Sequence, residues 1–304
     1  MSTVTRRAVV VGVDRSDPGL AAVQYAAAWA SRAKLPLRVL HAFEPTPYAM
    51  HAPIQGTLDV KAVLRKTAQR TLDDTMDVLA AVYPDLDVEV VLEEGSETEM
   101  LLRESEHAHA VVLGSRGVGG FADLVIGSTT LHVASHARCP VIAVPAPTGD
   151  EDFRTGVVVG VDGSEVSEAA IGFAFEAAAA TGQTLRAVHV WHDPTRTGVG
   201  LMMPLTYDLN QVMGEERLVL AESLAGWFEK FPDVDVEALV VPGHPVSVLS
   251  AAAADAQLLV VGSRGRGSIR SLVLGSVSHG VLHHASAPVA VVRDPTQSLH
   301  GRRE

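Results

Sequence analysis

The chain has little of what builds disulfide-rich or nucleic-acid-binding proteins. Its 304 residues include one cysteine, Cys139, so no disulfide forms within the chain. A lone cysteine is typical of a reducing compartment. Lysine and arginine number 24 against 36 aspartate and glutamate residues, for a formal net charge of −12. This acidic balance, without a basic run, disfavours binding to nucleic acid or to an anionic membrane.

Long hydrophobic runs are also missing. No stretch approaches the roughly 18 apolar residues of a transmembrane helix. The N-terminal "MSTVTRRAVVVGVDRS" has an apolar run too short for a secretion signal and is typical of a first strand. The sequence therefore predicts a soluble, cytoplasmic protein. Aromatic residues make up only 5% of the chain, which suits small-residue helices packed closely on a buried sheet.

Two familiar phosphate-binding motifs are absent as well. The chain has no G-x-x-x-x-G-K-[ST], so it is not a P-loop protein. No G-x-G-x-x-G follows the first predicted strand, so the dinucleotide fingerprint also fails.

What the chain does contain is one pattern twice, 148 residues apart. "VVVGVDRSD" is matched by "VVVGVDGSE", and "HARCPVIAVP" by "HASAPVAVVR". Two glycine-rich stretches, "GSRGVGGFADLVIGS" and "GSRGRGSIRSLVLGS", also coincide. A repeat this long indicates duplicated domains rather than a solenoid. We expect domain 1 at residues 1–148 and domain 2 at residues 149–304.

Strand-like and helix-like segments alternate within each copy. In the first copy the hydrophobic pattern predicts strands at 8–13, 37–43, 86–92, 109–114 and 140–144, and helices at 19–33, 60–82, 97–108 and 127–137. Such alternation predicts right-handed crossovers and a mainly parallel sheet covered on both sides. The fold class is α/β, twice. One long loop per copy, at 44–59 and 192–207, is of a length typical of functional or mobile segments.

The glycines cluster where a parallel sheet binds ligands. Gly12 and Asp14 end the first strand, and Gly114 ends the fourth. If these strands are neighbours at the switch point, both motifs line one crevice. We expect Gly114 and Gly117 to approach a ligand closely and to adopt positive φ.

After Gly117 and nine intervening residues, a helix is expected to begin at Gly127-Ser128-Thr129. Its free N–H groups and dipole predict an anion site that suits a polyphosphate. The same argument applies to Gly262, Gly265 and Gly275-Ser276. The alternative is that these turns only join a strand to a helix. The presence of the same glycines and of Gly-Ser at a helix start in both copies disfavours this alternative.

Several other residues leave alternatives open. Asp14 and Asp162 are candidates to accept from ribose or adenine, or to cap the following helix. His41 and His189 are either general bases or simply hydrogen-bonded. Phe43 and Trp191 are candidates for stacking on a base or for packing under the long loops. Cys139, at the start of a strand, is expected in the core.

Together, "VGVDGS", G-x-x-G, nine residues, G-[ST] and "CPV" resemble the universal stress protein family, in particular its tandem two-domain actinobacterial type. The resemblance covers nearly the whole chain. It implies five parallel strands per domain in the order 3-2-1-4-5, ATP bound in each domain, and a homodimer with a regulatory protein partner. It further implies that Ala42 and Val190 contact adenine through their backbones.

The expected nucleotide-binding residues follow from the glycine argument and this resemblance. In the first copy they are Gly12, Asp14, Ala42, Gly114, Ser115, Arg116, Gly117, Gly119, Gly127, Ser128 and Thr129. In the second copy they are Gly160, Asp162, Val190, Gly262, Ser263, Arg264, Gly265, Gly267, Gly275, Ser276, Val277 and Ser278. Arg15 stands where the second copy has Gly163, which makes the first site the less regular one.

The resulting hypothesis is an ATP-binding sensor or regulator in stress adaptation or growth control. Mg²⁺ is a candidate to bind together with the ATP phosphates. No histidine or cysteine spacing predicts a metal site formed by protein side chains. We find no convincing set of groups for efficient phosphoryl transfer. A slow ATPase or nucleotide-using transferase is the first alternative, and cAMP or another adenine nucleotide is the alternative ligand.

Overall fold

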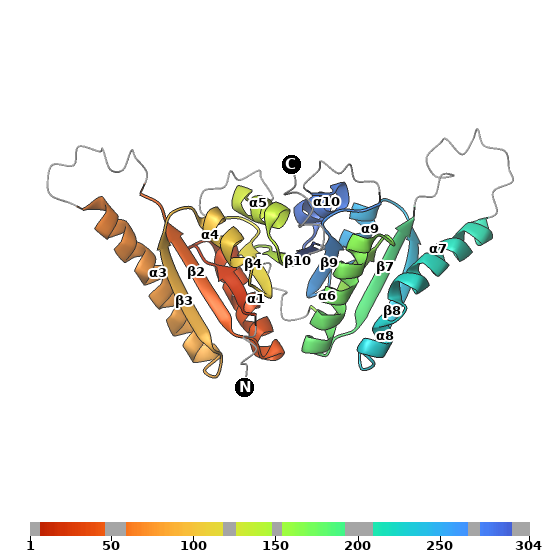
Figure 1. The fold of residues 1–304 in the computed structure, drawn as a ribbon, viewed down its shortest axis with the longest axis horizontal. Helices are drawn as coiled ribbons and strands as arrows, with labels where there is room; N and C mark the ends of the chain where they lie inside the picture. Colours follow the sequence, from red (N-terminus) through yellow and green to blue (C-terminus); the bar gives the residue numbers. More distant parts are fainter. Residues whose placement is uncertain are drawn as a thin grey trace, which may run out of the picture. The chain divides into compact units, whose positions relative to one another are not determined.

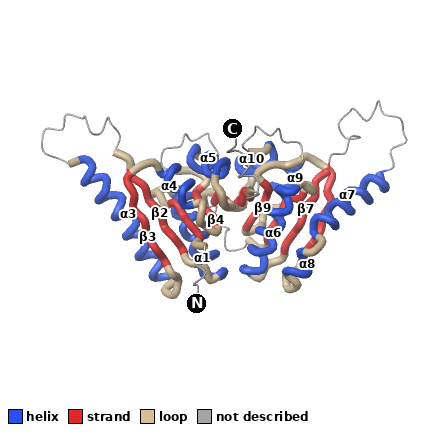
Figure 2. The backbone as a smooth tube through the Cα atoms, in the orientation of Figure 1, coloured by secondary structure: helices blue, strands red, loops and turns tan. Residues whose placement is uncertain are grey.

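The computed structural model of the chain describes residues 7–45, 59–117, 126–147, 154–191, 209–266 and 274–293. The chain divides into two compact units, Met1–Pro147 and Thr148–Glu304. Each unit is an α/β fold in which helices flank a sheet (Figures 1 and 2). The predicted fold class is therefore confirmed. The long loops at 44–59 and 192–207 fall almost wholly outside the described residues.

The first unit alternates strands and helices in the predicted sequence. Its elements are β1 (Val9–Gly12), α1 (Asp17–Ala33), β2 (Leu37–Phe43), α3 (Val60–Val82), β3 (Val88–Glu94), α4 (Glu97–Glu104), β4 (Ala110–Gly114), α5 (Ser128–His136) and β5 (Val141–Val144). The order is β3-β2-β1-β4-β5 with all pairs parallel, which is the predicted order 3-2-1-4-5.

The second unit repeats this arrangement with one added turn of helix. Its elements are β6 (Val157–Val161), α6 (Glu165–Thr181), β7 (Leu185–Trp191), α7 (Leu209–Leu224), α8 (Trp227–Lys230), β8 (Val236–Pro242), α9 (Pro245–Ala252), β9 (Leu258–Gly262), α10 (Ser276–His284) and β10 (Val289–Val292). The parallel order is β8-β7-β6-β9-β10.

The central strands are buried because helices cover both of their faces. β1 and β4 are buried at every position, as a continuous β-branched run requires. Helix α1 begins where Ser16 accepts from Gly19 N (3.1 Å), so Ser16 is its N-cap. α4 ends at Glu104, four residues before the predicted end, and the next residue, Ser105, donates its hydroxyl to Leu102 O (2.6 Å).

Candidate functional site

A cavity of about 360 Å³ opens at the carboxyl ends of β6 and β9 in the second unit. These neighbouring strands are followed by connections that lead to opposite sides of the sheet, to β7 and to β10. Such a switch point is where open parallel sheets bind ligands. The lining residues are Gly160, Val161, Asp162, Ser167, Val188, Val190, Pro245, Leu249, Val261, Gly262, Arg264, Gly265, Arg266, Gly275, Ser276, Val277 and Ser278.

Most residues expected in the second copy therefore surround one cavity. Those that line it are Gly160, Asp162, Val190, Gly262, Arg264, Gly265, Gly275, Ser276, Val277 and Ser278. Ser263 is instead buried, and its N–H donates to Val292 O (2.7 Å), which ties β9 to the end of β10. Gly267 lies outside the described residues.

One wall of the cavity is apolar. Val188 and Val190 of β7 face it together with Pro245 and Leu249 of α9. Of these, sequence reasoning found only Val190. Pro245 and Leu249 follow Gly243, which is an anchor of the repeat. The sequence signal for these lining residues was the start of a helix directly after the third strand. This wall suits a flat, uncharged ring.

Another part of the cavity lining suits an anion. The N-cap of α10 is Gly275, which has no side-chain cap, and the first N–H groups of a helix have no partner within the helix. The helix dipole adds positive potential there. Ser276 is exposed beside it, whereas the buried Ser278 donates its hydroxyl to Gly262 O (2.6 Å) and so joins α10 to β9.

Arginine side chains strengthen this positive end. Arg264 lines the cavity. Burial and the charge of the nearby Arg264 lower the pKa of Arg293 from its ordinary value. Sequence reasoning missed Arg293, which follows β10 and has Pro145 as its counterpart in the first unit. Two guanidinium groups close enough to repel each other favour an anionic ligand between or beside them.

The two aspartates organise the loops around the site. Asp162 accepts from Ser164 N (3.0 Å), Ser164 Oγ (2.7 Å) and Arg266 N (3.0 Å). Asp14 likewise accepts from the N–H and hydroxyl of Ser16. The helix caps are therefore Ser16 and Ser164, and the expectation that the aspartates cap the helices directly is wrong. They orient the capping serines instead.

The glycines act through close approach and not through positive φ. The positive φ expected at Gly114 and Gly117 is wrong, since among the described glycines only Gly95, Gly156, Gly163, Gly182, Gly226 and Gly243 have it. A Cβ on Gly114 would lie 2.7 Å from Pro18 C. A Cβ on Gly117 would lie 2.8 Å from Asp14 Oδ2, and one on Gly265 would lie 2.6 Å from Asp162 Oδ2. Gly114 thus lets α1 approach the end of β4, while Gly117 and Gly265 let their loops pack against the aspartates.

The first unit repeats the same framework. Gly127 is the N-cap of α5 and has no side-chain cap, so Ser128 and Thr129 begin the helix as predicted. Thr130 donates its hydroxyl to Gly114 O (2.7 Å), as Ser278 does to Gly262 in the second unit.

The remaining candidates of the first unit surround this framework. Gly12 ends β1, and Ala42 lies partly buried on β2. Ser115 N donates to Val144 O (2.6 Å), and Arg116 O accepts from Ser16 Oγ (3.4 Å). Gly119 lies outside the described residues.

The two strand-end histidines are held by hydrogen bonds to the backbone. His41 Nδ1 lies 2.6 Å from Val13 O, and His189 Nδ1 lies 2.7 Å from Val161 O. His189 is 3% exposed and its Nε2 lies 2.7 Å from Glu216 Oε2. Because both ring nitrogens of His189 are occupied, its role is to join β6, β7 and α7.

Other candidate side chains belong to the packing. Cys139 is buried, and burial raises the pKa of its thiol to about 12, so it is an inert core residue. Trp191 is 6% exposed and is absent from the described lining of the cavity. Within the described ranges no cluster of three or more His, Cys, Asp or Glu side chains could hold a metal ion. No described helix is long and apolar enough to cross a bilayer.

Strand order and cavity thus define a doubly wound α/β protein, with a cavity at the switch point of its second unit. The chain belongs to the universal stress protein family, which it matches over residues 5–145 and 155–293.

Individual relatives match almost end to end. The chain is 36% identical to a universal stress protein of Mycolicibacterium smegmatis, over 96% of this chain and 99% of that one. It is also 36% identical to one from Mycobacterium tuberculosis H37Rv, over 94% and 96%. The crystal structure of a universal stress protein from Archaeoglobus fulgidus shares the fold at a TM-score of 0.65 and 20% identity, covering 94% of this chain and 96% of that one.

Proposed function

We propose that each unit of the chain binds ATP and that occupancy regulates the protein's conformation or choice of partner. The cavity of the second unit carries this proposal, because apolar side chains and an uncapped helix N-terminus together line a cavity of about 360 Å³. That volume falls within the range of small-molecule sites. Adenine would pack on the wall beside Val190 and Pro245, and the phosphates would accept from the N–H groups of Ser276 and Val277.

The geometry favours binding over phosphoryl transfer. Asp162 is the acidic residue among the described lining residues, and both of its carboxylate oxygens accept hydrogen bonds from the protein. It is therefore committed to holding the loops and not to positioning a water. Differential affinity for two conformations is sufficient for a sensor without turnover. A Mg²⁺ ion would enter with the phosphates, with phosphate oxygens and water as its main ligands.

Membership of the family supports the remaining parts of the proposal. These are a cytoplasmic location, a role in stress adaptation or growth control, a homodimer, and a regulatory protein partner.

Competition for labelled ATP tests the choice of ligand. In equilibrium dialysis of the full chain we expect unlabelled ATP to displace the label, and cAMP to require about tenfold more ligand because it brings a single phosphate charge to the helix N-terminus. Displacement by cAMP at lower concentration than ATP would make a cyclic nucleotide the ligand. Steady release of inorganic phosphate that stops in an Asp14→Ala, Asp162→Ala variant would instead indicate an ATPase.

A further inference from the structure

Glu97 places a carboxyl group over the end of β1 in the first unit. It is the first residue of α4, after the N-cap Ser96, and it is partly buried. A Cβ built on Gly12 would lie 3.3 Å from Glu97 Oε1. The carboxyl therefore stands at the strand end where the expected nucleotide site begins.

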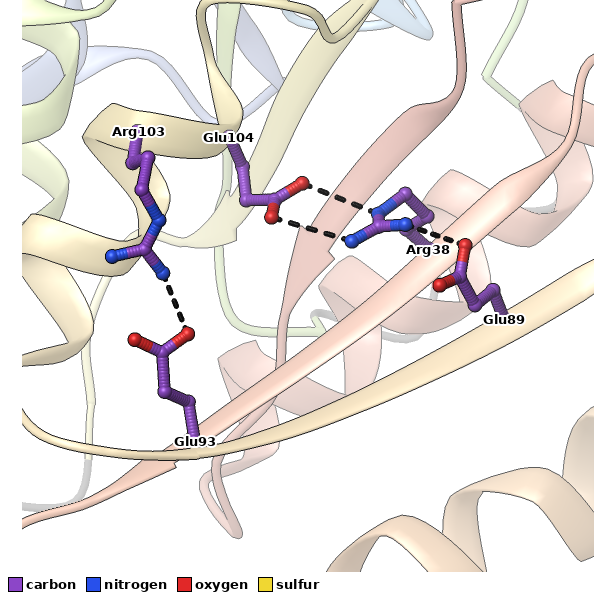
Figure 3. A network of polar contacts seen from close by, with 5 residues as sticks. All are labelled: Arg38, Glu89, Glu93, Arg103 and Glu104. Carbon is purple, nitrogen blue, oxygen red and sulfur yellow. Dashed lines mark hydrogen bonds and ion pairs between the residues drawn. The ribbon is translucent and has the colours of Figure 1, made fainter.

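An ion-pair network holds α4 in this place (Figure 3). Arg38 of β2 contacts Glu104 at the end of α4 at 3.2 and 3.3 Å, and Glu89 of β3 at 2.5 Å. Arg103 of α4 contacts Glu93 of β3 at 2.6 Å. These ion pairs attach the last turn of α4 to β2 and β3, and Glu97 lies at the other end of this short helix.

The second unit has Pro245 at the matching position, and Pro245 lines the cavity. Glu97 thus puts an acid where the second site has part of its apolar wall. Three other positions also differ in charge. Arg266 and Arg293 of the second copy correspond to Val118 and Pro145 in the first. Arg15 of the first copy, which corresponds to Gly163 of the second, offsets one of these changes, so relative to the second site the first gains a carboxyl group and loses one cation.

Burial is the main influence on the charge of Glu97, and Asp14 adds to it. Burial and, to a lesser extent, the charge of Asp14 raise the pKa of Glu97 to about 7. Asp14 is the one group whose charge acts on Glu97. The other charged or titratable groups on α4 and on the elements packed against it are Arg38 and His41 on β2, His132 and His136 on α5, and Glu99, Arg103 and Glu104 on α4 itself. Below neutral pH the group is a neutral carboxylic acid, and above it an ionised carboxylate.

We propose that Glu97 is the residue that makes the two sites of the chain different, so that the first site takes an adenine nucleotide only when the Glu97 carboxyl carries a proton. This inference rests on the proposed nucleotide function. A ligand that covers Glu97 removes it from water, and an ionised carboxylate then pays a desolvation penalty and repels the phosphates. A neutral carboxylic acid has a donor and an acceptor to offer to a base or a ribose. The second site, with Pro245, fills at either pH.

The test isolates the first site in the full chain. A Val277→Asp substitution closes the second site, and ATP affinity is then measured at pH 6 and pH 8 with Glu97 and with Glu97→Gln. Because ATP itself titrates in this range, the two chains are compared at each pH. The readout is the dissociation constant of the chain with Glu97 divided by that of the Glu97→Gln chain. The ratio should rise about tenfold from pH 6 to pH 8, since a group with a pKa of about 7 passes from protonated to ionised between them.

A second variant makes the reverse change in the second unit, so that the test does not depend on the first unit alone. With Thr129→Asp closing the first site, Pro245→Glu should give the second site the same pH dependence. A ratio that stays constant with pH overturns the role of Glu97 and leaves the nucleotide function standing. Absence of ATP binding by the first site at both pH values, with glutamate or glutamine, overturns the inference too. The Thr129→Asp chain then shows separately whether the second site binds ATP.

Discussion

Replacing Val277 with aspartate is expected to weaken ATP binding at the second site at least about a hundredfold, or about 2.8 kcal/mol. Val277 is the second residue of α10, where the phosphates are expected. An added carboxylate repels phosphate there, yet it complements the helix dipole and so should not destabilise the fold. Thr129 holds the same place in α5, and Thr129→Asp should close the first site alone.

Isothermal titration of each variant with ATP measures the effect, and thermal unfolding checks the fold. Val277→Asn and Thr129→Asn are the matched controls, because they have the shape of aspartate without its charge and should bind within a few-fold of the unchanged chain. If the aspartate and asparagine variants bind equally well, the phosphates do not lie at these helix ends.

A methyl group on Gly114 is expected to destabilise the first unit by about 3 kcal/mol or more. A Cβ there would lie 2.7 Å from Pro18 C and 2.8 Å from Gly19 N, and backbone atoms at the start of α1 cannot yield as side chains do. Relief requires α1 to move away from β4. Denaturant unfolding followed by the fluorescence of Trp29, which is buried in α1, reports this unit.

Gly262→Ala is the matched substitution in the second unit. Its Cβ would meet Val166 Cγ1 at 3.1 Å and Arg264 O at 3.2 Å, so small adjustments can relieve it and a loss of about 1 kcal/mol is expected. Trp191 and Trp227 report that unit. Equal losses for the two substitutions would contradict the close packing of α1 on Gly114.

The cluster of site residues was predictable because the chain repeats itself, whereas the strand order came from the resemblance to the family. Gly12, Gly114 and Gly127 have partners 148 residues later, so each turn was seen twice in the same context. Parallel-sheet geometry then brings the ends of the first and fourth strands together. The anion site followed from Gly-Ser at a helix start, which needs only local structure.

The residues that sequence reasoning missed depend on packing between distant segments. Nothing local shows that the first turn of α4 or α9 reaches over the first strand of its unit, so Glu97 and Pro245 were not singled out. The positive φ predicted for Gly114 failed for a similar reason. Glycine is needed there because α1 approaches the strand. The sequence alone does not show whether a glycine is present for positive φ or for the close approach of another segment.

Comparing the nucleotide bound by the unchanged chain and by the Thr129→Asp, Val277→Asp double variant tests the central claim most directly. Both proteins would be equilibrated with ATP at pH 6, separated rapidly from free ligand and denatured, and the released nucleotide identified and quantified by mass spectrometry. The account predicts ATP approaching two molecules per chain from the unchanged protein and almost none from the double variant. No nucleotide from the unchanged chain, or equal amounts from both, would contradict it.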